Sequence, residues 1–237
     1  MAKPDFPTEI VTLPSKGLLY PEGSPLSKGE IEMKYMTARE EDILTNQTLI
    51  EKGTVLDKLM QSLIVSDINY DDLLIGDKNG LMIAARILSY GKDYTFEYNG
   101  EEFTADLSEF DEKPLHKEVE KGVNNFEFTL PNSKKVVTFK LLTHKDERAI
   151  DQELRSLKRL KTNQTFELST RLKYIITSVD GDTETKTIRE FVDRELLAMD
   201  ARALRKYIKE IQPDIDLFFF PEQLSKGITL PITVQFF

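Results

Sequence analysis

Two stretches of this chain repeat each other, and the repeat limits the folds open to it. Residues 31–41 align with residues 137–147, so that apolar, lysine, threonine and acidic positions coincide 106 residues apart. A second match, Leu73-Leu74-x-x-Asp77 with Leu196-Leu197-x-x-Asp200, recurs 123 residues apart. Because sequence duplication is the signature of a repeated structural unit, we expect one unit to occur twice.

Each copy begins with an alternating run that predicts a strand with one buried face. A threonine then follows, and its hydroxyl can accept a backbone N–H at the start of a helix. In the first copy the spacing Thr-x-x-Glu predicts a capping box, and in the second Thr-x-x-Asp is a weaker version. The aspartates of the second match are expected to cap final helices over about 78–89 and 201–211. The predicted capping residues are Thr37 with Glu40, Asp77, Thr143, Thr187 and Asp200.

Between the first cap and the last helix, each copy predicts a polar helix and then an amphipathic one. The second copy is longer because of predicted loops over 160–166 and 179–188, the latter followed by a short helix that begins at Thr187. The expected apolar stripes are Leu56, Leu59, Met60, Leu63 and Ile64 in the first copy, and Leu168, Leu172, Ile175, Ile176 and Val179 in the second.

Three β segments flank these helices. Asn99-Gly100 predicts a type I′ turn between strands over 94–98 and 101–107, since both residues readily adopt positive φ angles. A second hairpin is expected over 126–130 and 136–142. The alternating residues 228–237 predict a strand that Pro231 confines to an edge or a bulge.

These elements predict an α+β fold with an internal pseudo-duplication: two related helical units, each preceded by a β-strand and followed by a β-hairpin or strand. We expect an extended N-terminal arm over 1–22, a first unit over 23–113, a linker over 114–125 and a second unit over 126–237.

Composition removes several classes of function. The chain has no cysteine, which excludes a thiol nucleophile, a disulfide and a cysteine-held metal, and its only histidines are His116 and His144. With 32 Lys and Arg against 41 Asp and Glu the net charge is −9, which argues against binding nucleic acid or an anionic membrane. No apolar run is long enough to cross a bilayer. We therefore expect protein partners, no enzymatic activity, and no catalytic, cofactor or metal site.

The N-terminal segment is too apolar for a disordered tail, and its prolines exclude a helix. Two interpretations stay open: the segment covers its own domain, or it adds to the surface of a partner. Apolar residues close the chain at its other end as well. The candidate partner-binding residues are Phe6, Ile10, Leu13, Lys16, Leu18, Tyr20, Phe236 and Phe237.

The N-terminal segment, together with later blocks of the chain, carries a resemblance to a known family. The blocks 13–21, 30–44, 73–79 and 87–91, together with the C-terminal residues 230–237, resemble the baseplate hub and hub-assembly proteins of T-even-type contractile-tailed bacteriophages. Some members of that family place Cys-x-x-Cys pairs in the β-hairpins after the helices, whereas this chain has none. A zinc ribbon is therefore not expected here.

The resemblance implies a non-enzymatic role in building the phage baseplate hub through contacts with other hub and tail proteins. Two alternatives remain: an assembly chaperone that acts in the host cytoplasm and then leaves, or a structural subunit retained in the virion tail baseplate. A cell-wall hydrolase that uses carboxylates is a remote third alternative.

Overall fold

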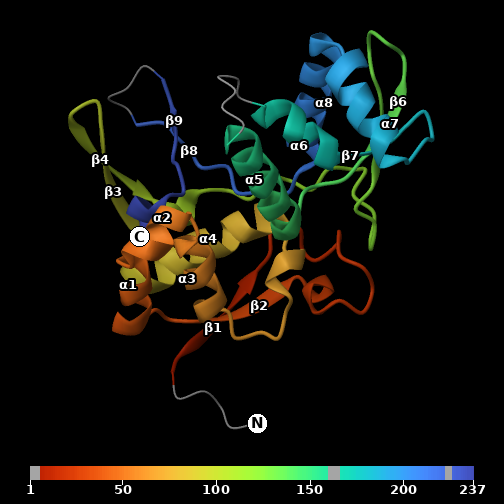
Figure 1. Cartoon of the computed structure of the whole chain (residues 1–237). Coiled ribbons are helices and arrows are strands. Elements are labelled where there is room, and N and C mark those ends of the chain that lie inside the picture. The colour runs from red at the N-terminus through yellow and green to blue at the C-terminus, as the bar shows by residue number, and fades with distance from the viewer. Residues whose placement is uncertain (1–5, 160–165, 222–225) are drawn as a thin grey trace.

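The computed structural model describes residues 6–159, 166–221 and 226–237, and within these residues the fold is α+β. Figure 1 shows the N-terminal part of the chain, in red to yellow, below the later helices in green to blue. Helix α4 (Ile75–Tyr90) runs through the middle of the molecule. The loop predicted over 160–166 lies almost wholly outside the described residues.

The first unit combines four helices with two strand pairs, and one strand of the first pair comes from the segment predicted as a separate arm over 1–22. Its elements before α4 are β1 (Thr8–Thr12), β2 (Glu30–Lys34), α1 (Ala38–Leu44), α2 (Gln47–Lys52) and α3 (Val55–Leu63). After α4, the Asn99-Gly100 turn joins β3 (Asp93–Tyr98) to β4 (Glu101–Asp106). Both turn residues have positive φ, 55° and 84°, which confirms the predicted hairpin.

The second unit repeats the order of the first. Its elements are β5 (Phe126–Thr129), β6 (Val136–Phe139), α5 (His144–Arg159), α6 (Glu167–Ile175), β7 (Ile176–Val179), α7 (Thr185–Glu190) and α8 (Ala198–Ile211). A π-helical turn over Phe191–Glu195 follows α7. Short strands β8 (Phe218–Phe219) and β9 (Ile228–Thr229) pair near the C-terminus.

Strand pairing confirms the duplication. β1 pairs antiparallel with β2, as β5 does with β6. On the other side of β2, Met33 bridges Ile64, which follows α3; at the equivalent place Phe139 on β6 pairs with Ile176, which follows α6. In each unit the chain therefore forms two paired strands and then helices, and it then returns to pair with the free side of the second strand.

The helix starts after β2 and β6 are held by the same set of side chains. In the first copy the Glu40 carboxylate accepts from the Thr37 amide at 3.0 Å and hydroxyl at 2.6 Å, and Lys34 Nζ lies 2.7 Å from it. In the second, Asp146 accepts from the Thr143 amide at 3.1 Å and hydroxyl at 3.0 Å, and Lys140 Nζ lies 2.7 Å away. The predicted caps Thr37 and Thr143 are confirmed.

Thr37→Ala is expected to lower the free energy of unfolding by about 1 kcal/mol, since it removes a capping side chain. Thr143→Ala should have a similar effect, because Thr143 holds the equivalent position. Urea denaturation of both variants measures this, with Thr45→Ala, an exposed residue just after α1, as the control. Unchanged midpoints in both variants would contradict the assignment of these helix starts.

Glu40 makes stability depend on pH. Burial alone would raise its pKa, but hydrogen bonds from Lys34, Thr37 and Ser62 outweigh burial and lower the pKa to about 2. A carboxylate with a depressed folded-state pKa stabilises the fold above its unfolded-state pKa, and that stabilisation is lost as pH falls through the folded value. Stability should therefore decline between about pH 4.5 and 2.

Denaturation midpoints measured across that range for wild type and Glu40→Gln test this prediction. The variant should be less stable at neutral pH and should lose less on acidification. Asp42→Asn, at an exposed position of the same helix, is the control, and its denaturation midpoint should fall on acidification as that of wild type does. Equal acid sensitivity of wild type and Glu40→Gln would contradict the role given to this carboxylate.

Two sequence predictions were wrong in part. The second apolar stripe does not continue as a helix beyond Ile175, because residues 176–179 form β7 against β6. Leu168, the first residue of that stripe, is 45% exposed. Of the strand predicted over 228–237, only β9 forms; after Pro231 the chain turns into a 3-10 helix over Val234–Phe236.

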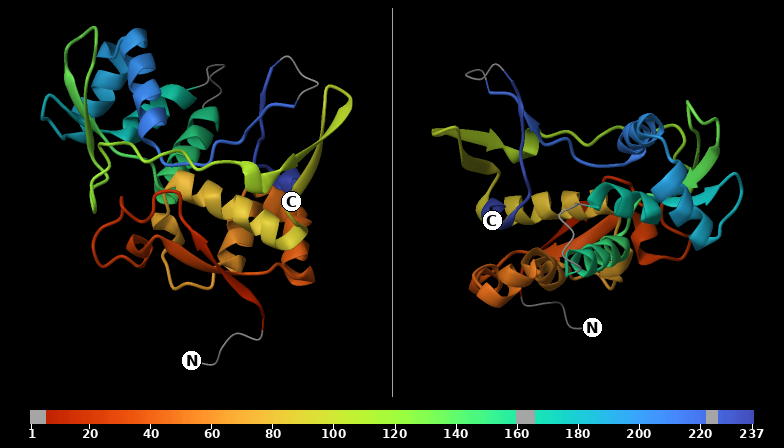
Figure 2. Two further views of the ribbon diagram at one scale, coloured as in Figure 1. Left: turned by 180° about the vertical axis from the view of Figure 1, so that it is seen from behind. Right: turned by 45° about the horizontal axis from the view of Figure 1, so that its top comes forward.

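That C-terminal turn returns to the first unit and completes a second, smaller core. Phe236 is fully buried, its ring lies 4.9 Å from that of Tyr94 on β3, and its carbonyl accepts from Arg86 on α4. The views in Figure 2 show the β3–β4 hairpin and the C-terminal strands side by side, next to the end of α4. The last residues thus tie the hairpin to α4.

Candidate functional site

Three of the predicted partner-binding residues are core residues of this chain. Leu13 and Phe236 are fully buried and Tyr20 is 4% exposed, so none of the three can contact a partner in this fold. The physical reason is that the N-terminal segment is not a free arm: it supplies β1, and its turn continues into the body against α4. Of the two interpretations left open, this part of the segment covers its own unit.

The other candidates remain at the surface. Ile10 on β1 is 65% exposed and Phe6 is 37% exposed. Lys16 is exposed and forms an ion pair with Glu112, while Leu18 and Phe237 are half-buried. Phe6 and Ile10 are therefore the apolar residues of the N-terminal segment that a partner could reach.

Asp77 does not cap its helix. Helix α4 begins two residues earlier, at Ile75, which places Asp77 inside the first turn with its side chain fully buried. Its carboxylate accepts from the Ser15 amide at 2.8 Å, the Ser15 hydroxyl at 2.6 Å and the Tyr20 hydroxyl at 2.6 Å. Asp77 therefore fastens the N-terminal turn to α4. Burial raises the pKa of Asp77, although these hydrogen bonds act to lower it.

Asp200 has the equivalent position in the second unit and the same structural role. Helix α8 begins at Ala198, and the buried Asp200 carboxylate accepts from the amide and side chain of Asn132, both at 2.8 Å, and from the Ser133 amide at 3.0 Å. Burial raises the pKa of Asp200, but these hydrogen bonds outweigh it and bring the pKa to about 2. Its prediction as a helix cap was wrong in the same way.

The sequence also contains a repeated tripeptide before these two turns, which the repeat alignment did not include. Thr12-Leu13-Pro14 precedes the turn that Asp77 holds, and Thr129-Leu130-Pro131 precedes the turn that Asp200 holds. Leu13 and Leu130 are both fully buried. Aligning the two tripeptides would have identified residues 8–12 as the counterpart of β5.

Thr187 is also not a cap. Helix α7 begins at Thr185 with Glu184 before it, so Thr187 lies inside the first turn. The start is set by the preceding turn, where the Asp182 side chain accepts from the Glu184 amide at 2.8 Å.

The two units meet where α4 and α5 begin. Leu74 forms an antiparallel bridge with Thr143. The Ile75 amide donates to the Leu142 carbonyl at 3.1 Å, and the His144 amide donates to the Leu73 carbonyl at 2.8 Å. The first N–H group of each helix has no partner inside that helix. Each helix thus finds an acceptor in the segment that precedes the other.

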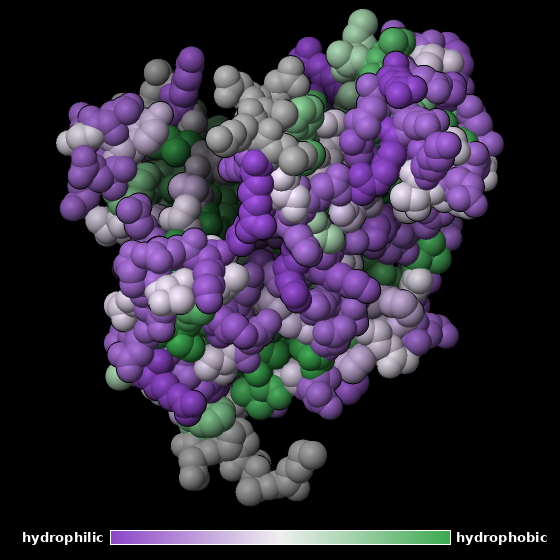
Figure 3. Space-filling view, in the orientation of Figure 1, coloured by the Kyte–Doolittle hydropathy of each residue, from purple (hydrophilic) through white to green (hydrophobic). Residues whose placement is uncertain are grey.

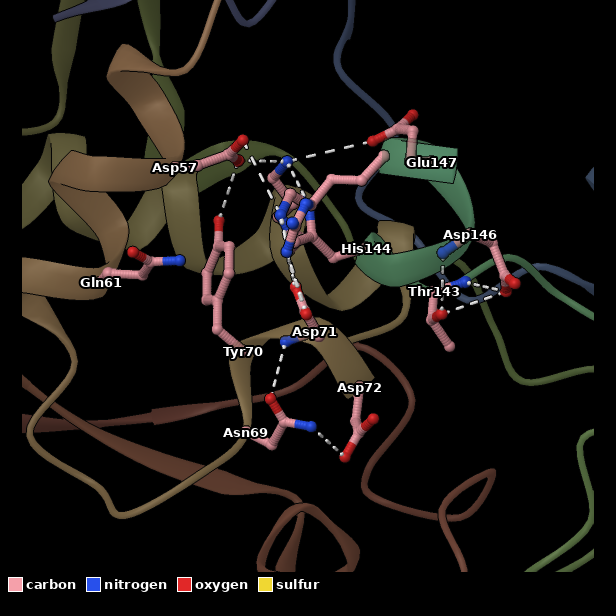
Figure 4. Close-up of polar contacts among 12 residues, drawn as sticks. Asp57, Gln61, Asn69, Tyr70, Asp71, Asp72, Thr143, His144, Asp146 and Glu147 are labelled. Carbon is pink, nitrogen blue, oxygen red and sulfur yellow. Dashed lines mark hydrogen bonds and ion pairs between the residues drawn. The ribbon is translucent and has the colours of Figure 1, made fainter. Parts of the chain in front are cut away.

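Charged side chains surround this junction (Figure 4). Lys78 on α4 lies 2.7 Å from Asp57 on α3 and 3.9 Å from Glu147 on α5. Asp71 accepts from Arg148 at 2.9 and 3.0 Å. The cluster therefore joins elements of the first unit to α5 of the second by ion pairs as well as by the backbone.

His144 lies at the centre of the cluster and is 3% exposed. Its ring packs edge-on against Tyr70, with centroids 4.7 Å apart, and its Nδ1 lies 3.3 Å from Lys78 Nζ. Burial lowers the pKa of His144, and the charge of Lys78 lowers it further. The neutral imidazole can therefore accept a hydrogen bond from Lys78.

A pocket of about 390 Å³ opens beside this cluster, and the C-terminal residues Thr233 and Val234 also line it. Asp57, Lys78, Glu147 and Arg148 of its lining belong to the ion pairs of this cluster, and His144 and Asp151 line it as well. Within residues 6–159, 166–221 and 226–237, no three His, Asp or Glu side chains are grouped as metal ligands. This arrangement of charges suits the attachment of the two units to each other through ion pairs.

Comparison of the chain with protein-family models, with curated proteins and with solved structures found no match. Among the helices that the structure describes, none has both the length and the apolar character needed to cross a membrane.

Proposed function

We propose that this chain is a non-enzymatic component or assembly factor of a phage tail baseplate hub, and that it acts through contacts with other hub and tail proteins. The proposal starts from the resemblance carried by residues 13–21, 30–44 and 73–79. In the structure these blocks lie together: Ser15 and Tyr20 hold Asp77, and the block 30–44 forms β2 and α1 beside them. The resemblance therefore follows the framework of the first unit.

The observation that most favours a protein partner is a group of exposed aromatic side chains. Tyr98 on the β3–β4 hairpin is 40% exposed, and Phe218 and Phe220 of the C-terminal segment are 51% and 61% exposed. We call these three residues the aromatic edge. Large apolar side chains that are exposed together as a patch commonly mark sites of protein contact.

A groove of about 450 Å³ lies between β3 and β9 at the aromatic edge, with Phe96, Tyr98 and Leu230 among its lining residues. Around it the surface is mainly hydrophilic; in Figure 3 apolar side chains gather in the recess beside the hairpin and low on the first unit. A charge of −9 favours a partner with basic or neutral contact residues over nucleic acid.

Inactivation of the gene in the phage that encodes this chain tests the proposal. Particles from infected cells should lack complete baseplates by electron microscopy, and expression of the wild-type chain in the host should restore them. Normal tails in the absence of the chain would contradict the proposal.

Mass spectrometry of purified tails separates the two alternatives within it. A structural subunit should be present at a fixed ratio to known tail proteins. An assembly chaperone should be absent from tails and present in hub intermediates in the host cytoplasm.

A further inference from the structure

The junction between the two units joins two surfaces, and each of them has a second copy elsewhere in the chain. One surface is the leucine edge, Leu73 and Leu74 in the first unit and Leu196 and Leu197 in the second. The other is the cap edge, residues 142–144 in the second unit and residues 36–38 in the first. Duplication thus produces two leucine edges and two cap edges, while the internal junction uses one of each.

The used and unused copies differ in exposure. At the junction Leu73 is fully buried, Leu74 is 3% exposed and His144 is 3% exposed. The unused leucine edge is open to solvent, with Leu197 50% exposed and the neighbouring Met199 70% exposed. The unused cap edge is open as well, since Thr37 and Ala38 are exposed.

The backbone groups follow the same pattern. At the junction the Ile75 and His144 amides each donate to a carbonyl of the other unit. Their counterparts in the repeat are the amides of Ala198 and Ala38, the first residues of α8 and α1. In the parts of the chain that the structure covers, neither of these two amides has an acceptor.

Charge also matches, with the signs exchanged. The junction pairs Asp71 beside the leucine edge with Arg148 beside the cap edge. At the unused edges the equivalent positions hold Arg194 and Asp42. Both residues are exposed, and neither forms an ion pair with another described residue. The unused surfaces therefore also carry complementary charges, with the positive charge beside the leucine edge and the negative charge beside the cap edge.

One molecule cannot bring its own unused edges together. Helix α1, next to the unused cap edge, and helix α8, next to the unused leucine edge, lie at opposite ends of the molecule in Figure 1 and in both views of Figure 2. A complementary surface for either edge can therefore come only from another chain.

We propose that this occupant is a second copy of this chain: the leucine edge of one molecule docks on the cap edge of the next, with Arg194 facing Asp42. The contact reproduces between molecules the junction that joins the two units within each molecule. It is heterologous, so repetition builds a ring if the rotation closes and a filament if it does not. This self-association goes beyond the proposed hub function.

Sedimentation velocity over a range of concentrations tests the proposal by charge reversal. Wild type should sediment faster as concentration rises. Arg194→Asp and Asp42→Arg each place like charges opposite one another, and each should weaken association about tenfold. In an equimolar mixture each contact between unlike variants pairs opposite charges, so the two variants should associate by alternating. The double variant also pairs opposite charges and should associate as wild type does.

Lys206→Asp is the matched control, because it makes the same charge change at an exposed position of α8 away from the leucine edge. It should associate as wild type does. Thermal melts establish that each variant is folded. The proposal is overturned if wild type stays monomeric at every concentration, if either single reversal associates normally, or if the mixture remains as two separate monomers. None of these results bears on the gene-inactivation phenotype.

Discussion

Asp77→Ala is expected to lower the free energy of unfolding by about 3–5 kcal/mol, a larger loss than any other single substitution proposed for this chain. The side chain is fully buried, and its removal leaves the Ser15 amide and the Tyr20 hydroxyl without their acceptor in the interior. Each buried donor left unpaired costs about 1–3 kcal/mol. Urea denaturation followed by circular dichroism measures the loss.

Asp200→Ala is the matched comparison, since Asp200 holds the equivalent turn of the second unit. Its donors belong to Asn132, which is exposed, and Ser133, which is half-buried, so water can replace part of what the carboxylate provides. We expect a loss of about 1–2 kcal/mol. Equal effects of the two substitutions, or an Asp77→Ala variant as stable as wild type, would contradict the structural role given to Asp77.

Removal of residues 1–20 is expected to abolish cooperative folding of the chain. The truncation deletes β1, the buried side chains of Leu13, Leu19 and Tyr20, and the three hydrogen-bond donors that reach Asp77 from the described residues. Loss of one buried leucine typically costs about 2–5 kcal/mol, and the whole stability of a domain is about 5–15 kcal/mol. The truncated chain should therefore lack a sigmoidal thermal transition.

Ile10→Ser is the control for the truncation, because Ile10 lies on the same strand with a mostly exposed side chain. It should melt within a few degrees of wild type. A truncated chain that melts cooperatively near the wild-type temperature would show that residues 1–20 are a separable arm after all.

Local signals predicted the parts of the fold that depend on neighbouring residues. The capping threonines Thr37 and Thr143 bond within three residues of themselves, so the strand and helix start could be inferred from sequence at both places. The turn at Asn99-Gly100 needs only the positive φ angles of its own two residues.

Parts that depend on distant contacts could not be predicted in the same way. Residues 176–179 continue a helical spacing of apolar positions, but their β-branched side chains and an open edge on β6 make them a strand. Asp77 and Asp200 have the residue type of a cap, yet both turn inward to bind a turn that lies more than 60 residues away in the sequence.

The candidate functional surfaces show the same division. Phe6 and Ile10 could be named from the sequence and are exposed, whereas Leu13, Tyr20 and Phe236 could be named and are buried. The aromatic edge and the unused leucine edge were not among the expected site residues, because exposure depends on which surfaces the two units cover in each other. That outcome follows from the junction at Leu74 and Thr143, which has no local signal.

Co-purification of the tagged chain from infected cells tests the central claim most directly, namely that this protein works by binding hub and tail proteins. Wild type should recover baseplate hub or tail proteins in a fixed set. A folded variant that carries Tyr98→Ser and Phe220→Ser at the aromatic edge should recover less of them, while Lys206→Asp should recover as much as wild type. Recovery of no tail protein by the wild-type chain would contradict the account.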